Sequence, residues 1–217
     1  IEKEQFYKIQ SFSKSRRVSL NDMLITAYIR VLHKVTGCND ITVPCPVDLR
    51  TYKREGKVCG ICNLTANYSC CVDVTPDEPF VDTLKKVSWQ MTTQKKSDTC
   101  LKGPMLYHMI FHILPLGMVR KIVYKIAPVP VTSYSNLGMI SNEKFRFADL
   151  AVEDAFISTA VKHAPYFQLS VSTYRGCCTL TSSLYGTEED RKIVDNLLSQ
   201  VEIELNIGRR QSSVCLT

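Results

Sequence analysis

Apolar residues recur every three or four positions in two long segments, the spacing at which side chains share one face of a helix. The first repeat follows Ser19 and Asp22, a variant of the capping box, and stops at Gly37. We therefore predict a helix from about residue 19 to residue 36. The second repeat follows Pro79, a residue typical of a first helical turn. It ends at two lysines, whose charge suits the C-terminal end of a helix dipole.

Two further helical segments are predicted. Residues 104–118 form the most apolar stretch, but it is shorter than the roughly 20 residues of a membrane span, so we expect a buried helix broken at Pro115. Thr187, followed by three acidic residues, is expected to cap a last helix. The buried stripe expected on that helix is Ile193, Val194, Leu197, Leu198 and Val201.

Strands are predicted where β-branched or alternating residues are concentrated, at 41–47, 61–74 and 129–134. The first of these runs contains two prolines, which donate no hydrogen bond to a ladder. It is therefore expected to end early or to lie at a sheet edge.

Residues 167–174 and 177–185 alternate as well, and only Arg175 and Gly176 separate them, which predicts a tight hairpin. The chain thus holds about four helices and five or six strands. This order predicts an α/β fold with a mixed β-sheet and helices packed on it.

Composition narrows the functional classes. The 217 residues include 27 Lys and Arg against 21 Asp and Glu, giving a net charge of +6, and 45% are apolar. Disordered and fibrous classes are excluded. The basic residues are spread along the chain without long runs, so neither nucleic-acid binding nor a membrane patch is favoured.

Ten cysteines raise the question of disulfides or metal. Cys70-Cys71 and Cys177-Cys178 are neighbours whose side chains point to opposite faces of a strand, which is awkward for a disulfide framework. With no apolar signal segment at the start, we expect reduced thiols in a cytoplasmic protein. Cys59-x-x-Cys62 has zinc-ligand spacing but lacks a second pair, so no metal is expected, and a zinc-stabilised interaction domain remains an alternative.

The four histidines offer little local evidence of catalysis. His33 lies in the first predicted helix, and His108 and His112 share one face of an apolar helix, where packing is favoured over a metal pair. His163 precedes a predicted strand and is a candidate binding-site residue. The chain contains no nucleophile elbow, phosphate loop or dinucleotide fingerprint.

The order of segments resembles the second half of condensation-domain-like acyltransferases, which have the chloramphenicol acetyltransferase fold. This group includes nonribosomal peptide condensation domains and alcohol or polyketide-associated acyltransferases. The likeness covers most of the chain. It rests on residues 18–37, 40–43, 46–50, 60–64, 80–94, 134–138 and 169–174.

The resemblance implies that residues 1–207 are a C-terminal lobe and 208–217 a tail. The family's acid/base histidine belongs to a His-His-x-x-x-Asp-Gly motif in the first half, and no histidine here is followed four residues later by Asp. The general base is then expected on an N-terminal lobe, and one face of this chain is expected to be unusually apolar or functional because that lobe covers it.

Only a few positions of this sequence match functional residues of the family. Arg50 matches the arginine that pairs with the motif aspartate of the other half, although a solvated arginine is the alternative. Ser135 and Asn136 match a segment beside the active-site channel, where they would bond the oxyanion or position the acceptor, and an ordinary turn is the alternative. Asn63 and His163 are expected to line the channel.

The implied activity moves an acyl group from a thioester of coenzyme A or of a phosphopantetheinyl carrier protein to an alcohol or amine. No tightly bound cofactor is expected. The expected partners are the N-terminal lobe, an acyl carrier protein and a small-molecule acceptor, with no nucleic acid and no membrane span. A non-catalytic binding or scaffold module with the same fold is the other reading.

Overall fold

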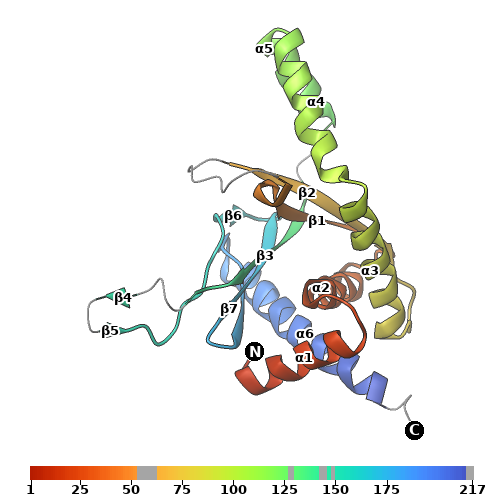
Figure 1. The fold of residues 1–217 in the computed structure, drawn as a ribbon, viewed down its shortest axis with the longest axis vertical. Helices are drawn as coiled ribbons and strands as arrows, with labels where there is room; N and C mark the ends of the chain where they lie inside the picture. The colour runs from red at the N-terminus through yellow and green to blue at the C-terminus, as the bar shows by residue number, and fades with distance from the viewer. Residues whose placement is uncertain (53–62, 127–129, 142–145, 148–149, 214–217) are drawn as a thin grey trace.

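The computed structural model describes residues 1–52, 63–126, 130–141, 146–147 and 150–213 (Figure 1). Its helices are α1 Lys3–Ser15, α2 Leu20–Thr36, the 3₁₀ helix η1 Leu49–Tyr52, α3 Phe80–Lys96, α4 Thr99–Ile113, α5 Leu116–Ile126 and α6 Glu188–Ser213. Its strands are β1 Asp40–Asp48, β2 Thr65–Asp73, β3 Thr132–Met139, β4 Arg146–Phe147, β5 Leu150–Ala151, β6 Lys162–His163, β7 Phe167–Tyr174, β8 Cys177–Thr181 and β9 Leu184–Tyr185.

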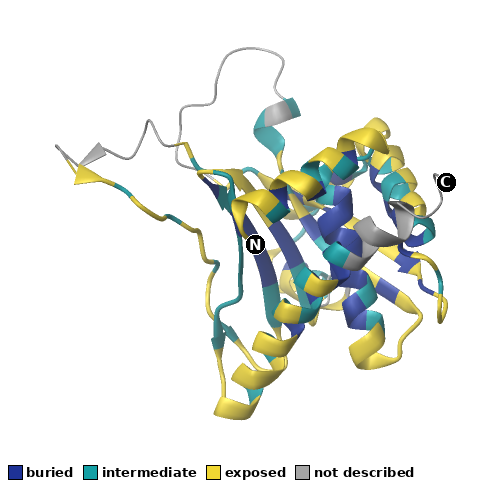
Figure 2. Ribbon diagram, turned by 90° about the horizontal axis from the view of Figure 1, so that it is seen from below, coloured by how far each residue is buried: buried dark blue, intermediate teal, exposed yellow. Residues whose placement is uncertain are grey.

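The central helix is α2, which confirms the helix predicted from the first apolar repeat. The Ser19 hydroxyl accepts the backbone N–H of Asp22 at 3.0 Å, and the Asp22 carboxylate accepts that of Ser19 at 3.2 Å. Gly37 ends the helix in the left-handed region, at φ +69°. Residues 22–29 are buried without interruption, because α1, α3, α6 and β1 pack around this helix. Figure 2 shows the buried residues of the molecule in dark blue, gathered between its helices and strands.

The strands form the mixed arrangement that the sequence predicts. β1 pairs antiparallel with β2, from Asp40 opposite Asp73 to Asp48 opposite Thr65. β7 pairs with β3 in parallel and with β8 antiparallel. β1 lies beside β3 without a shared ladder in the described part of the chain, so its only ladder there is to β2, and the edge position predicted from its two prolines is confirmed.

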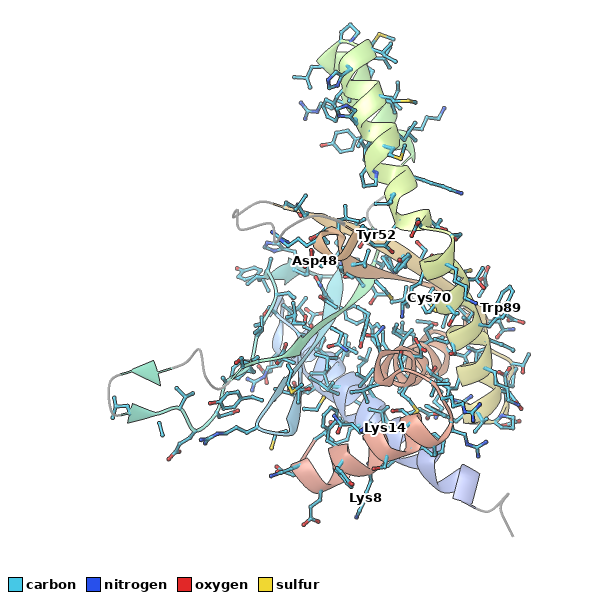
Figure 3. The ribbon with its side chains drawn as sticks, viewed as in Figure 1. Lys8, Lys14, Asp48, Tyr52, Cys70 and Trp89 are labelled. Carbon is cyan, nitrogen blue, oxygen red and sulfur yellow. The ribbon has the colours of Figure 1, made fainter. Side chains whose placement is uncertain are left out.

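Burial separates the inner and outer faces of these elements. In β2 every second residue is buried, which places the side chains of Ala66, Tyr68, Cys70 and Val72 on the core side. Figure 3 shows Cys70 between β2 and the helices, while Trp89 projects outward from α3. The neighbouring cysteines behave as expected for strands, since Cys70 and Cys178 are buried free thiols and Cys71 is exposed.

The hairpin between β7 and β8 turns at Arg175 and Gly176, as predicted. Both residues have positive φ, +48° and +87°, the geometry of the tight turns that match strand twist. The arginine guanidinium stacks over the ring of Tyr174, 5.8 Å from its centroid.

Gly176→Ala is expected to lower the free energy of unfolding by about 1–2 kcal/mol, because a side chain is strained at that φ and its Cβ would lie 3.1 Å from Cγ of Lys3. Urea denaturation measures the change. Gly103→Ala is the control, since it meets open space within α4 and is expected to be neutral or stabilising. Equal stability of Gly176→Ala and the native protein would contradict this account of the turn.

Some predictions need correction. The break at Pro115 is present, between α4 and α5, but the stretch around it is not buried: Met105 is 66% and Ile113 74% exposed. His108 and His112 are likewise exposed and lie against each other, with ring centroids 4.2 Å apart. An apolar stretch predicts a buried helix, yet from Lys102 to Ile113 all residues except Tyr107 and Ile110 are exposed.

The last helix also differs in detail. α6 begins after Thr187, whose hydroxyl and Asp190 form a reciprocal cap, as predicted. Ile193 is exposed, however, while the buried stripe extends to Leu205. α6 continues across residues 207 and 208, and the division there into a lobe and a tail stays a prediction. None of the described helices combines the length and apolarity that crossing a membrane requires.

Candidate functional site

Ser135 and Asn136 lie within β3 and not in a turn. Adjacent strand residues point to opposite faces, so Ser135 is buried beside Ser170 of β7, whereas Asn136 is exposed on the face that meets α2. The pairing with β7 becomes irregular between Asn136 and Met139, where Gly138 has φ +74°. The two side chains therefore lie on opposite faces of the sheet, although the residues are neighbours in sequence.

The amide of Asn136 is held from both ends. Its Nδ2 donates to Oδ1 of Asn21 at 3.2 Å, and its Oδ1 accepts the backbone N–H of Gly138 at 2.9 Å. The Tyr134 hydroxyl donates to the same Asn21 oxygen at 3.0 Å. This polar cluster fixes the amide so that its nitrogen faces the start of α2.

The start of α2 contributes a helix dipole that favours negative charge beside this cluster. Asn21 is the second residue of α2, so the positive end of a 17-residue helix dipole lies beside the Asn136 amide. Burial, the largest cause, raises the pKa of the Tyr134 hydroxyl well above its ordinary value, so this group stays protonated and remains a donor. The cluster consists of donors preorganised around one acceptor, at the exposed end of β3.

Ser135 belongs to a different environment, a layer of hydroxyl groups on the opposite face of the sheet. Ser170 and Ser172 are buried there; the first donates to the Thr159 hydroxyl at 3.3 Å, and the second accepts the backbone N–H of Ile157 at 3.2 Å. These bonds attach the extended segment around residues 157–159 to β7. Ser135 therefore lies in a layer whose serine hydroxyl groups form hydrogen bonds with the backbone and with other hydroxyl groups.

Arg50 follows β1 within η1. Its guanidinium Nη1 lies 3.2 Å from Oδ1 of Asp48, and its backbone N–H donates to the same oxygen at 2.9 Å. The backbone bond is the largest cause that holds the pKa of the Asp48 carboxyl below its ordinary value, and the guanidinium adds to it. The structure thus places Arg50 against Asp48 at the end of the preceding strand, and pairing with an aspartate of another lobe stays a prediction.

Asn63 is brought to the same end of the β1–β2 ladder. It is exposed and directly precedes Leu64, whose carbonyl accepts the N–H of Leu49 at 2.8 Å. Residues 53–62 between these segments, with Cys59, Gly60 and Cys62, lie outside the described residues.

His163 stands apart from these groups. It lies in β6, which pairs with β9, and its exposed ring is 5.1 Å from that of Tyr185. His33 contacts the carbonyl of Cys38 through Nδ1 at 2.8 Å. In the described part of the chain, no hydrogen bond joins either histidine to Asn136 or Arg50.

Sequence reasoning missed the hydroxyl pair beneath η1. The Tyr52 and Tyr68 hydroxyls bond to each other, and the thiol of Cys100 lies close enough to affect both, linking η1, β2 and α4. Burial is the largest cause that raises the pKa of Tyr68. Figure 3 shows Tyr52 near Asp48 at this corner. Alternation along β2 marks Tyr68 as inward, but no local pattern indicates its partner.

The fold has solved counterparts. The chain is 14% identical to the epimerization domain from the third module of tyrocidine synthetase B, over 97% of its own length and 46% of that chain, with a TM-score of 0.61. Polyketide synthase associated protein 5 from Mycobacterium tuberculosis is also 14% identical (94% and 48% covered, TM-score 0.61). The condensation domain of the Monacolin K polyketide synthase is 13% identical (94% and 45%, TM-score 0.61).

No family model matches the sequence, and no curated protein matches it. The structural similarity confirms the fold that the order of segments suggested, that of condensation domains and related acyltransferases. The chain spans a little under half the length of these structures.

Proposed function

We propose that this chain is the C-terminal lobe of a two-lobed acyltransferase. The observation that carries the proposal is the match of nearly the whole chain to less than half of condensation and acyltransferase structures. The proposed donor is an acyl thioester of coenzyme A or of a phosphopantetheinyl carrier protein, and the acceptor is an alcohol or an amine. The proposed partners are the N-terminal lobe, a carrier protein and the acceptor, in the cytoplasm.

In this reaction the acceptor oxygen or nitrogen attacks the thioester carbonyl, and the proton it loses passes to a histidine of the other lobe. The carbonyl oxygen becomes an oxyanion, the carbon–sulfur bond then breaks, and the thiolate leaves and takes up a proton. We assign oxyanion stabilisation or acceptor positioning to Asn136, because its amide N–H is fixed beside the α2 N-terminus.

The sequence assigns the same role to Ser135, but the place of Ser135 in the buried hydroxyl layer favours Asn136 for this role. Arg50 is proposed to hold the loop of the other lobe that carries the histidine, through a guanidinium–carboxylate contact. Asn63, at the same end of the ladder, and His163 are proposed to line the channel.

The test combines this chain with its N-terminal lobe in one protein and measures thiol release from acyl-coenzyme A and acyl-pantetheine, with alcohol and amine acceptors. Arg50→Ala is expected to lower kcat/KM at least tenfold, consistent with the loss of a charge-assisted bond. Arg191→Ala on α6 is the matched control, since its carboxylate contacts are long and exposed.

Release no faster than without protein, for every donor and acceptor pair, would contradict acyl transfer and favour the binding or scaffold module. A change of less than tenfold for Arg50→Ala would remove only the role assigned to that residue.

A further inference from the structure

Helices α4 and α5 form a hairpin that projects from the rest of the molecule (Figure 1). The first turn of α4 is fixed to the core, since Cys100 is 3% exposed and Leu101 packs against the buried cluster. Beyond it Pro104 has no N–H to donate to the Cys100 carbonyl, so that helical bond is missing. The hairpin is thus anchored at its base and free along the rest of its length.

The hairpin is the most concentrated exposed apolar surface in the described part of the chain. Two features make it unusual: no charged residue occurs from 103 to 119, and apolar side chains stand on nearly every side of α4. A helix apolar all round is typical of a protein core or of lipid. The exposed large apolar residues are Met105, Leu106, Met109, Phe111, Ile113, Leu116, Met118 and Tyr124.

The charges of the hairpin all have one sign. From residue 99 to residue 142 the sequence contains no Asp or Glu, although acidic residues are common elsewhere in the chain. The four charged residues of this stretch are basic: Lys102, and on α5 Arg120, Lys121 and Lys125. An anionic surface is the complementary partner.

The distance along α5 between the apolar tip and the basic residues is similar to the depth at which amphipathic helices insert into a membrane interface. Leu116 lies at the tip, and Arg120 and Lys121 follow four and five residues later, about 6–8 Å further along the helix. Amphipathic segments bury their apolar faces about 5–10 Å into the boundary between headgroups and acyl chains. With the tip at that depth, both cations reach the phosphate level, and Lys125 lies one turn behind them.

We propose that the α4–α5 hairpin docks the protein on an anionic phospholipid membrane by inserting its tip into the interface. The helices have 15 and 11 residues, about 22 and 16 Å, so they enter the surface and do not cross the ~30 Å hydrocarbon core. A second copy fits less well, because two identical hairpins would bring like charges together. A protein partner, the proposed N-terminal lobe included, would cover one side of α4, whereas its exposed apolar residues occupy several sides.

Tryptophan fluorescence tests insertion at one position. Trp89, the one tryptophan of this chain, lies on α3 away from the hairpin, so W89F removes the background and F111W adds a probe near the tip. Vesicles of equal parts phosphatidylglycerol and phosphatidylcholine are expected to shift the F111W emission to the blue, and brominated lipid to quench it. Phosphatidylcholine vesicles are expected to do neither, and salt to weaken the effect.

Vesicle sedimentation then separates the two contributions. Phe111→Asp is expected to weaken binding at least tenfold, and the combined change of Arg120, Lys121 and Lys125 to Gln about a hundredfold, from about fivefold per charge. Ile193→Asp is the control, since it places the same charge at an exposed aliphatic position on α6 and is expected to change nothing. Circular dichroism verifies that each variant is folded.

Several results would overturn the proposal. One is equal binding to neutral and anionic vesicles, or none to either. Another is an F111W emission already shifted to the blue without lipid, which would mean that protein covers the tip, from a second copy if the shift depends on concentration. Equal weakening by Ile193→Asp would also count against it.

Discussion

Replacing Arg30 by alanine is expected to lower the free energy of unfolding by about 3–5 kcal/mol, because it removes one partner of a buried charge pair. The Arg30 Nε lies 2.5 Å from a carboxylate oxygen of Glu204, a residue of α6 that is 1% exposed. The same guanidinium donates at 2.8 Å to the Glu78 carbonyl and to the Thr83 hydroxyl. One side chain thus joins α2, α6 and the start of α3.

The loss should depend on pH in a defined direction. Burial acts to raise the pKa of Glu204, but hydrogen bonds from Lys34 and Arg30 outweigh it and hold the pKa below the ordinary value. A carboxyl whose pKa is lower in the folded state stabilises the protein above its unfolded pKa, and this contribution is lost as the pH falls through the folded pKa. The difference between the native protein and Arg30→Ala is therefore largest near neutral pH and shrinks below about pH 4.

Urea denaturation at pH 7 and at several acidic values measures both effects. Glu78 provides a second acid-sensitive contact in the native protein: burial opposes its ionisation, yet bonds from Lys86, Thr75 and Thr83 lower its pKa to about 2. Arg191→Ala, which alters only exposed contacts, is expected to change stability by less than about 0.5 kcal/mol. A similarly small loss for Arg30→Ala at pH 7 would show that Lys34 alone compensates Glu204.

Asn136→Ala is expected to lower kcat about a hundredfold in the two-lobed protein, the effect of removing one oxyanion donor. The expectation rests on the proposed acyl transfer and on the fixed amide, whose oxygen is bound to Gly138 and whose nitrogen faces Asn21. Thiol release under single-turnover conditions measures the chemical step directly.

Asn21 serves as a positioning residue in this account. Asn21→Ala is expected to lower kcat about tenfold, and Asn21→Asp, which keeps an oxygen acceptor for Tyr134 and Asn136, to restore part of the loss. Asn21→Ala should have little further effect once Asn136 is alanine.

Ser135→Ala is the matched comparison, one residue away on the opposite face of β3. If it lowers kcat more than Asn136→Ala does, the reacting carbonyl lies on the hydroxyl face, and the role assigned to Asn136 is wrong.

Local patterns predicted most of the fold. The cap at Ser19, the stop at Gly37 and the turn at Arg175 and Gly176 depend on short-range chemistry, and each is present. The prediction of a buried helix around Pro115 is wrong. An apolar sequence indicates that a segment favours a nonaqueous environment, but it does not show whether the rest of this chain covers the segment. The sequence does show that residues 99–142 contain no Asp or Glu, but only the structure shows that α4 and α5 project from the rest of the molecule.

The candidate site was predicted less completely. Strand alternation alone separates Ser135 from Asn136, but the motif had suggested that both act together. Asn21 was not recognised, because its contact with Asn136 joins residues 115 positions apart. The buried bond between Arg30 and Glu204 spans 174 positions and has no local signal either.

Because neighbouring cysteines alternate between buried and exposed, their rates of alkylation report local opening of the sheets. Cys70 lies inside the β1–β2 ladder and Cys178 inside the β7–β8 ladder, and burial is the largest cause that raises the pKa of each thiol, that of Cys178 to about 11. Cys71, one residue from Cys70, is exposed. Under native conditions an alkylating reagent modifies the buried thiols only during transient opening, so their rates compare the local stability of the two sheets.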